Sequence, residues 1–368
     1  MPVIIDGSSG ITTPTYGGAD TSEYLVPVTQ FKNRIINGAM VIDQRNAGTS
    51  VSLSTTTQYP VDRFGGIEDT DGAMTAQQDS SAPAGFVNSL KFTTTTADAT
   101  LAATQYARCQ QRIEGYNIAD LGWGTANAKT ITISFWVRSS LTGTFGGALT
   151  NNGFDRSYPF TYTISVADTW EYKTVTIAGD TSGTWLTTNG LGIQVIWGLG
   201  VGSTYSGTAG AWAGAGYLSA TGATSVIGTL NATWYITGVQ LEVGSTATSF
   251  DYRPYTTELQ LAQRYYQNSY NVGNAPSSST ANENLVTTTA WNDGNAPWQG
   301  MFVVNMRSAP TVTLRAKGST TTGQITSAGT ARSASADYIS NKSVGYISVT
   351  SGTAGGYSQY MFELSSEL

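Results

Sequence analysis

The sequence predicts an all-β protein built from antiparallel sandwiches, and three observations carry the prediction. Several segments alternate apolar and polar residues with a period of two, which is typical of strands with one buried face. Aromatic residues make up 11% of the chain, with 20 Tyr and 9 Trp, and the polar residues are mostly Thr, Ser and Asn, a composition that favours strands. Turn formers separate these segments at short spacing, as in a sandwich.

Length and composition exclude several kinds of chemistry. The 368 residues suggest two or three domains. The chain has no histidine and one cysteine, Cys109. This excludes Ser-His-Asp and Cys-His relays, histidine zinc sites and intramolecular disulfides. We therefore expect no catalytic residues, no metal and no cofactor.

Charge and hydropathy indicate that the protein neither binds nucleic acid nor inserts into a membrane. The net charge is −6, only 11% of residues are charged, and no cluster of Lys and Arg is present. Phosphate contacts dominate nucleic-acid binding, so we expect no nucleic-acid partner. No run of 18 apolar residues occurs, so we expect no membrane insertion.

Residues 1–30 form a separate N-terminal segment in this prediction. The segment is rich in turn formers, and its one apolar run is Val3, Ile4 and Ile5. Such a run needs another surface to bury it, which predicts attachment to a partner. A frayed terminus is the alternative.

Residues 31–255 are predicted to form the first and larger sandwich. The expected strands are 89–93, 130–138, 160–166, 173–177, 192–197 and 232–243. No charged residue occurs from 181 to 241. Within that stretch, 198–228 lacks a strand pattern. A loop of this length is often functional, although it can also cover a sheet or contact another subunit.

Residues 256–282 are predicted as a short helix followed by a linker. Thr256 or Thr257 is the expected cap of a helix over 256–266, and Glu258 suits its N-terminal end. A helix of this length needs packing to be stable, and its apolar stripe is the face expected to pack. The stripe consists of Leu259, Ala262, Tyr265 and Tyr266.

Residues 283–368 are predicted to form a smaller C-terminal β module. The expected strands are 301–304, 310–315, 345–349 and 360–364. A module of this size is marginally stable alone, and oligomerisation is one way to enlarge its core.

The charged residues leave several roles open. The densest acidic cluster, Asp62, Glu68, Asp69 and Asp71, could supply paired carboxylates for catalysis or ligands for Ca²⁺, or be solvated loop acids. The arginines near predicted strands and turns are expected to pair with acids such as Asp43 or Asp62, with Arg63 anchoring its loop in this way. They are Arg34, Arg45, Arg63 and Arg253.

Aromatic side chains in polar, uncharged segments are the candidate ligand-binding residues. Sugar rings stack their apolar faces on Trp and Tyr, and neutral polar groups bind the hydroxyls. The alternative is that these rings fill cores or subunit interfaces. The candidates for glycan binding are Tyr205, Trp212, Tyr217, Trp291 and Trp298.

Several motifs resemble those of tailed-phage and prophage structural proteins, in particular tail fibres. They occupy residues 1–7, 33–46 (Asn-Arg-Ile-Ile-Asn-Gly-Ala-Met), 59–64, 131–139 and a segment running from 236 to 266. The resemblance implies a jelly-roll-like sandwich similar to carbohydrate-binding modules. It also implies a homotrimer located in the phage tail and attached to the virion through the N-terminus. It supplies no catalytic or ligand-binding residues.

These observations together predict a function. We expect a virion structural protein, a tail fibre that contacts other tail or baseplate proteins and binds host surface polysaccharide, and not an enzyme. One alternative is a polysaccharide depolymerase that uses Asp and Glu pairs. The other is a head decoration or whisker protein.

Overall fold

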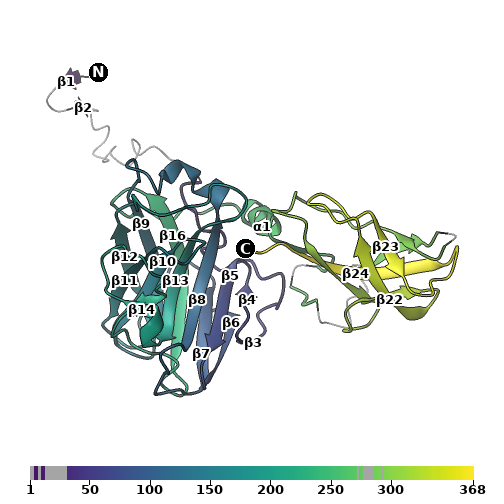
Figure 1. The fold of residues 1–368 in the computed structure, drawn as a ribbon, viewed down its shortest axis with the longest axis horizontal. Coiled ribbons are helices and arrows are strands. Elements are labelled where there is room, and N and C mark those ends of the chain that lie inside the picture. The colour runs from purple at the N-terminus through teal and green to yellow at the C-terminus, as the bar shows by residue number, and fades with distance from the viewer. Residues whose placement is uncertain (1–3, 7–9, 13–30, 272, 277–284, 292) are drawn as a thin grey trace.

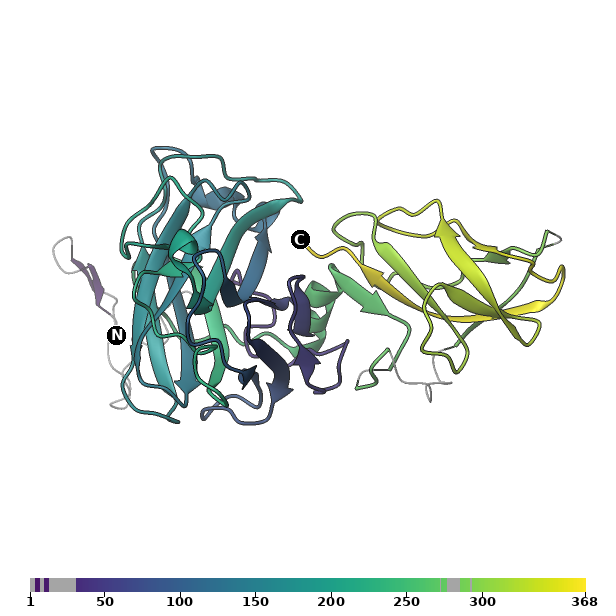
Figure 2. The same ribbon diagram turned by 60° about the horizontal axis from the view of Figure 1, so that its bottom comes forward.

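We analysed a computed structural model, which describes residues 4–6, 10–12, 31–271, 273–276, 285–291 and 293–368. The described chain is all-β, as predicted, with two modules lying end to end (Figures 1 and 2). None of its helices is long and apolar enough to cross a membrane. Two short strands, β1 (Ile4–Asp6) and β2 (Gly10–Thr12), pair antiparallel near the N-terminus. Val3 and the side chains of Ile4 and Ile5, the predicted attachment residues, lie outside the described part.

The larger module is a jelly-roll-like sandwich of two six-stranded antiparallel sheets (Figure 1). The strand order of sheet I is β11 (Ser157–Ile164), β10 (Gly143–Thr150), β13 (Leu191–Val201), β8 (Tyr106–Glu114), β5 (Phe64–Asp69) and β4 (Gln58–Val61). The order of sheet II is β12 (Glu171–Ile177), β9 (Ile131–Ser139), β16 (Thr233–Val243), β7 (Ser89–Thr96), β6 (Ala73–Asp79) and β3 (Val51–Ser52).

The core of this module lies between the sheets and follows the period-two pattern. On β9, Ile131, Ile133, Phe135 and Val137 are all fully buried. The ring of Phe135 packs edge-on against Trp197 of β13, with centroids 5.7 Å apart. Each fully buried side chain of this size contributes about 1.5–3 kcal/mol through loss of water contact. The alternation that predicts the strands therefore also determines which face is buried.

The segment 198–228 contains more regular structure than its sequence suggests. β13 continues to Val201 and is followed by a 3-10 turn, η4 (Ser203–Tyr205). Two short strands, β14 (Ser206–Gly207) and β15 (Ser219–Ala220), then pair in parallel. Two further 3-10 turns, η2 (Gly115–Asn117) and η3 (Ala119–Leu121), follow β8.

The Asn-Arg-Ile-Ile-Asn-Gly motif stabilises the sandwich through its two asparagines. Asn33 accepts hydrogen bonds from the backbone N–H groups of Ile35 (2.9 Å) and Leu241 (3.0 Å), and it donates to the carbonyl of Val239 (3.0 Å). Asn37 has φ 61°, a conformation that asparagine tolerates. Its amide donates to the carbonyls of Ile42 (2.8 Å) and Asp62 (2.9 Å).

Helix α1 (Tyr255–Gln263) packs on this motif, but its ends differ from the prediction. Pro254 occupies the N-cap position without a side-chain hydrogen bond, so neither Thr256 nor Thr257 caps the helix. The helix stops at Gln263 because Tyr266 already begins β17 (Tyr266–Asn268), which pairs with a strand of the second module. Three of the four residues of the predicted stripe, Leu259, Ala262 and Tyr265, pack together with Leu261, Ile36, Val41, Ile42 and Leu368. The fourth, Tyr266, belongs to β17 and not to the helix.

The C-terminal module is organised around its last strand, β24 (Tyr357–Ser365). Its first half pairs with β18 (Val286–Thr289) and β21 (Gln324–Ser327), and its second half with β17 and β20 (Thr311–Ala316). The sheet continues through β22 (Thr330–Asp337), β23 (Tyr346–Val349) and β19 (Ala296–Pro297). These strands enclose a separate small core that includes Leu314, Ile325, Ile347, Tyr360 and Phe362.

The strand predicted over 301–304 does not form. The amide side chain of the buried Gln267 takes the place of a neighbouring strand, since it accepts from Val303 N–H (2.8 Å) and donates to the carbonyl of Val304 (2.9 Å). Met301 and Val303 stay exposed, whereas Phe302 packs against the small core.

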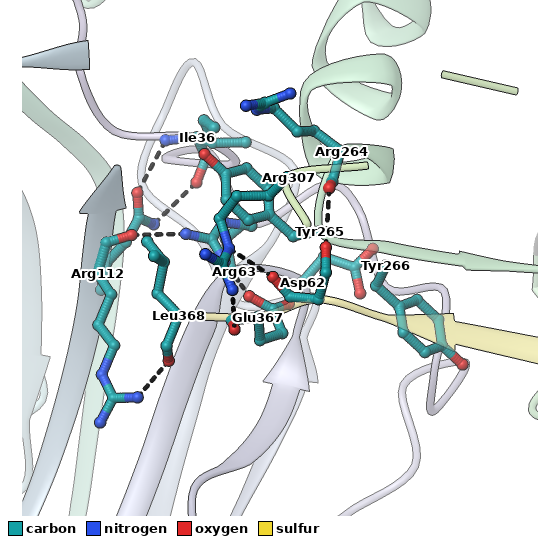
Figure 3. A network of polar contacts seen from close by, with 12 residues as sticks. Ile36, Asp62, Arg63, Arg112, Arg264, Tyr265, Tyr266, Arg307, Glu367 and Leu368 are labelled. Atoms are coloured by element: carbon teal, nitrogen blue, oxygen red, sulfur yellow. Dashed lines mark hydrogen bonds and ion pairs between the residues drawn. The ribbon is translucent and has the colours of Figure 1, made fainter. Parts of the chain in front are cut away.

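A dense polar network joins the two modules (Figure 3). Residues beyond β24 return to the larger module, where Glu367 pairs with Arg63 and with Arg45 (2.8 Å). Arg264 forms two contacts with the buried Glu114, at 2.6 and 2.8 Å. The guanidinium of Arg63 also lies over the ring of Tyr265, 3.5 Å from its centroid.

The predicted arginine pairs are confirmed in part. Arg45 binds Asp62 at 2.8 Å, and Arg34 binds Asp120 at 2.7 Å. Arg63, predicted to anchor its loop by pairing with an acid, pairs with Glu367 and not with the adjacent Asp62. Its side chain extends into the junction, where it also donates to the carbonyl of Arg112.

Candidate functional site

A groove lined by aromatic rings lies on the outer face of sheet II, and we call it the aromatic groove. It has a volume of about 670 Å³. Its five rings belong to Phe86, Trp136, Tyr172, Phe250 and Tyr252, and hydroxyl groups of Ser134, Thr248 and Ser249 lie among its lining residues. None of the lining residues carries a charge.

Two neighbouring strands present the first pair of rings. Trp136 on β9 alternates with the fully buried Phe135 and Val137, so it points away from the core. Tyr172 on β12 lies directly opposite it in the antiparallel register. The two ring centroids are 5.4 Å apart, and Tyr172 is 43% exposed. The pair therefore forms an apolar platform that solvent can reach.

A bulge in β16 makes room for the third ring. The pairing of β16 with β9 shifts between Thr237 and Gln240, and Gly238 inside this bulge has φ 60°. A Cβ atom on Gly238 would lie 2.7 Å from Phe86 Cζ and 3.0 Å from Trp136 Cδ1. The absence of a side chain here thus allows Phe86 to approach Trp136.

Phe250 and Tyr252 complete the groove from the segment after β16. Phe86 contacts both rings, with centroids 5.1 Å from Phe250 and 5.5 Å from Tyr252. The Tyr252 hydroxyl donates a hydrogen bond to the carbonyl of Gly85. Partial burial raises the pKa of Tyr252 above its usual value, so the hydroxyl stays protonated and able to donate at neutral pH.

Buried polar side chains hold the segment that carries the hydroxyls. Glu242 accepts hydrogen bonds from Thr248 N–H (2.8 Å) and from its hydroxyl (2.6 Å). The ammonium of Lys32 donates to the carbonyl of Ser249 at 2.7 Å. Because Glu242 is 3% exposed, its two bonds to Thr248 are partly shielded from water and fix the rim of the groove.

The arrangement of rings and hydroxyls suits binding, and the ionised groups next to it, Glu242 and Lys32, hold the rim. Flat rings offer apolar contact to the faces of a ligand, and uncharged hydroxyls can exchange hydrogen bonds with it. A general acid or base must lie within hydrogen-bond reach of its substrate. The lining residues include no carboxylate, amine or imidazole.

Two of the five aromatic residues singled out from the sequence are partly buried and pack against the cores of the modules. Trp212 contacts Trp123 and Trp185, with centroids 5.3 and 5.5 Å away, and its indole N–H donates to the carbonyl of Ala178 (2.8 Å). Trp298 packs against Tyr360 and Phe362 in the small core.

The other three are divided between the two modules. Trp291 is 45% exposed and lies 5.6 Å from the ring of Tyr346. Tyr217 packs over Gly207, where an added Cβ would lie 2.2 Å from its ring. Tyr205 lines a second pocket together with Arg108 and lies close to the segment of Tyr217, since the N–H of Leu218 donates to its carbonyl (2.8 Å). The five residues therefore do not form one site.

The acidic cluster of the sequence is dispersed in the structure. Asp62 is fully buried against Arg45 and Gln44, whereas Glu68 accepts from Thr70 N–H at 2.7 Å. In the part of the chain that the structure describes, no three His, Cys, Asp or Glu side chains come together in a group that could hold a metal ion.

Sequence reasoning missed the aromatic groove. Its rings come from four segments that are far apart along the chain, and their pairing depends on the register of β9 and β12. One signal was available: Trp136 occupies a position that alternation assigns to the solvent face of its strand. A large ring on a solvent face indicates a contact surface.

Comparisons with known proteins give only distant similarities. No family model and no curated protein matches the sequence. Among solved structures, the enzymatically active domain of tailspike protein 4 of bacteriophage CBA120 is similar over 58% of this chain, at 10% identity and a TM-score of 0.30. This chain spans only 22% of that domain.

Two further similarities involve binding modules that are matched over almost their whole length. A family 11 carbohydrate-binding module from Clostridium thermocellum, in complex with a mixed-linked tetrasaccharide, matches 54% of this chain and 98% of its own, at 11% identity and a TM-score of 0.28. The N-terminal cellulose-binding domain of a Cellulomonas fimi β-1,4-glucanase matches 50% and 90%, at 14% identity and a TM-score of 0.23. Similarities at this level do not define a function.

Proposed function

We propose that this protein is a glycan-binding protein and that the aromatic groove holds an uncharged segment of the glycan. The observation that carries the proposal is the platform of Trp136 and Tyr172, with ring centroids 5.4 Å apart on an exposed sheet face and bordered by hydroxyl groups. The axial C–H groups of a sugar ring form an apolar face that matches such a platform. A groove without charge suits a neutral sugar, because no buried ion is left unpaired on binding.

The size of the groove agrees with a short oligosaccharide. Its volume of about 670 Å³ lies within the range of roughly 300–1,000 Å³ that small-molecule sites occupy. Thr248 and Ser249 line the groove together with the rings. The Ser249 hydroxyl can bond to a hydroxyl of a stacked sugar, whereas the Thr248 hydroxyl already donates to Glu242 and is left to accept. Their segment is already fixed by Glu242, so binding orders little additional chain.

The test is a titration of the full chain with neutral gluco-, galacto- and manno-configured tetrasaccharides by calorimetry. We expect at least one to bind, and Tyr172→Ala to weaken that binding about fivefold or more, because stacking of a planar nucleobase on an aromatic ring is worth about 1–3 kcal/mol and we expect a stacked sugar face to lose a similar amount. Trp291→Ala is the control, since it removes an exposed ring from the other module. Unchanged affinity in Tyr172→Ala, or no binding to any of the sugars, contradicts the proposal.

We further propose that the protein is a tail fibre of a tailed phage, located in the phage tail. In this proposal it is a homotrimer that contacts tail or baseplate proteins through residues 1–30 and binds host polysaccharide without cleaving it. The motifs at 33–46 and 236–266, which resemble those of tail fibres, support this proposal. If the purified protein releases reducing ends from host polysaccharide, the proposal is wrong and the protein is a depolymerase. If antibodies against it label the phage head, it is a head decoration protein.

Deletion of residues 1–30 tests the attachment and the oligomeric state together. We expect the truncated protein to be absent from particles but still folded, since the strands of both modules lie within residues 31–368. Light scattering is expected to give the full chain a mass three times that of a single chain, which is 38.8 kDa. A monomer at micromolar concentration contradicts the trimer, and truncated protein on particles contradicts the attachment.

A further inference from the structure

A second pocket lies on the opposite sheet of the larger module. It has a volume of about 440 Å³ and is lined by Tyr106, Arg108, Phe154, Thr204, Tyr205, Gly216 and Leu218. Tyr106 and Arg108 are on β8 of sheet I, where they alternate with the fully buried Ala107 and Cys109. The two lining residues therefore face away from the core, and the pocket is separate from the aromatic groove on sheet II.

Arg108 places an uncompensated positive charge in this pocket. The residue is only 5% exposed, and its Nε and Nη1 atoms are buried without a hydrogen-bond partner in the described chain. No carboxylate among the described residues pairs with it, and the charged group that acts on it most is the like-charged Arg112. Burial lowers the pKa of Arg108 to about 10, so the guanidinium still carries its charge at neutral pH.

An arrangement of this kind calls for a partner. A buried charge with unpaired hydrogen-bond donors is unfavourable unless something compensates it. The rings of Tyr106 and Phe154 compensate in part, since the guanidinium carbon lies 5.1 and 6.0 Å from their centroids. Rings cannot accept the N–H hydrogen bonds in the plane of the guanidinium, and a planar anion can.

The walls of the pocket indicate what else the ligand contains. Tyr106 and Tyr205 meet edge to face, with centroids 5.5 Å apart and an angle of 87° between their planes. Phe154 is 36% exposed at the mouth, and Thr204 adds a solvent-accessible hydroxyl. Aromatic walls around a single cation match a ligand that joins an anion to a ring with an apolar face.

We propose that this pocket binds an acidic sugar residue, a hexuronate, whose carboxylate pairs with Arg108 and whose ring contacts Tyr106 and Tyr205. The sugar hydroxyls then face Thr204 and the solvent. A sugar phosphate carries the same anionic chemistry. We commit to the carboxylate, because two parallel N–H···O bonds fit its planar shape. Since Nε and Nη1 are buried in the free protein, forming both bonds requires the rings that cover the guanidinium to shift on binding. This proposal does not rest on the aromatic groove, since the two sites share no lining residue.

The experiment titrates the full chain with methyl glucuronide, methyl glucoside and glucose 6-phosphate, followed by ligand-observed NMR and calorimetry. We expect methyl glucuronide to bind at least tenfold more tightly than either of the other two, and its affinity to fall as salt is added. Arg108→Met keeps the length and apolar contacts of the stem and removes the charge. We expect this variant to lose glucuronide binding by tenfold or more while its thermal midpoint stays the same or rises.

Two controls separate this site from the groove. Tyr172→Ala is expected to leave glucuronide binding unchanged, and Arg108→Met to leave neutral tetrasaccharide binding unchanged. Equal binding of glucuronide and glucoside, or full glucuronide affinity in a folded Arg108→Met variant, overturns the proposal. Preference for glucose 6-phosphate over glucuronide also overturns it, because the anion recognised is then a phosphate.

Discussion

Gly238 determines the shape of the aromatic groove at the scale of a single residue. Its φ of 60° is a conformation that glycine adopts at little cost and alanine does not. The space above it is occupied by Phe86 and Trp136, at the distances given above. The bulge, the left-handed backbone and the ring cluster therefore depend on one another at this position.

Gly238→Ala is expected to damage both stability and binding. The backbone conformation costs about 1 kcal/mol for a residue with a Cβ, and Phe86 must move to relieve its contact. We predict a decrease of about 1–3 kcal/mol in the free energy of unfolding, measured with denaturant, and at least tenfold weaker binding of the neutral tetrasaccharide.

Gly222→Ala is the matched control: its φ is +78° and no atom lies within 4 Å of the added Cβ. Equal binding losses in the two variants would show that Phe86 does not act through this contact.

At the scale of elements, the sequence predicts the strands well where one face is buried and the other is wet. The predicted strand at 130–138 is β9 (Ile131–Ser139), and the one at 173–177 lies within β12 (Glu171–Ile177). Both alternate in sequence. Burial follows the alternation along β12, whereas the outer-face residues Thr132 and Ser134 of β9 are also buried. The strands missed in the second module, such as β22 (Thr330–Asp337), contain few large apolar residues. β22 pairs with the strands next to it in sequence, β21 and β23, but its small residues give no alternating apolar pattern that would reveal it.

The candidate site was less accessible to prediction than the strands. Alternation assigns Trp136 to the solvent face, but nothing local indicates that Phe86 and Phe250 join it. The sequence also gives no indication of the charge in the second pocket. Arg108 lies in a strand whose local sequence does not differ from that of the other strands. Its lack of an acidic partner is a property of the tertiary arrangement. Tyr205, chosen from the sequence as an aromatic residue in an uncharged loop, does line that pocket.

At the scale of the whole molecule, Glu367 connects the two modules. Its carboxylate is 8% exposed and pairs with Arg45 and Arg63, the latter 2% exposed. Burial lowers the pKa of Arg63, so its charge depends on this acid for compensation. Breaking a buried pair from one side leaves an uncompensated charge, which usually costs several kcal/mol.

Glu367→Gln is therefore expected to lower the free energy of unfolding by about 3 kcal/mol and to uncouple the modules. We predict that calorimetry shows one dominant transition for the native chain and two separated transitions for the variant, with the C-terminal module unfolding first because its core is smaller. Asp168→Asn is the control. The side chain of Asp168 is 58% exposed and lies 3.4 Å from the guanidinium of Arg138, so its removal is expected to lower the free energy of unfolding by less than about 1 kcal/mol. A similar small effect in both variants would contradict the proposed role of Glu367.

The course of β24 has a mechanical consequence. The chain enters the second module through β17 and comes back through the end of β24, and these two strands pair side by side at the junction. A pull on the far end of the second module is thus shared by two adjacent strands loaded along their length. A force along the strands loads their hydrogen bonds in shear, so that these bonds and the ion pairs beyond Ser365 must break together and not one at a time. We therefore expect the junction between the two modules to resist a pulling force along the strands better than a junction held by a single strand.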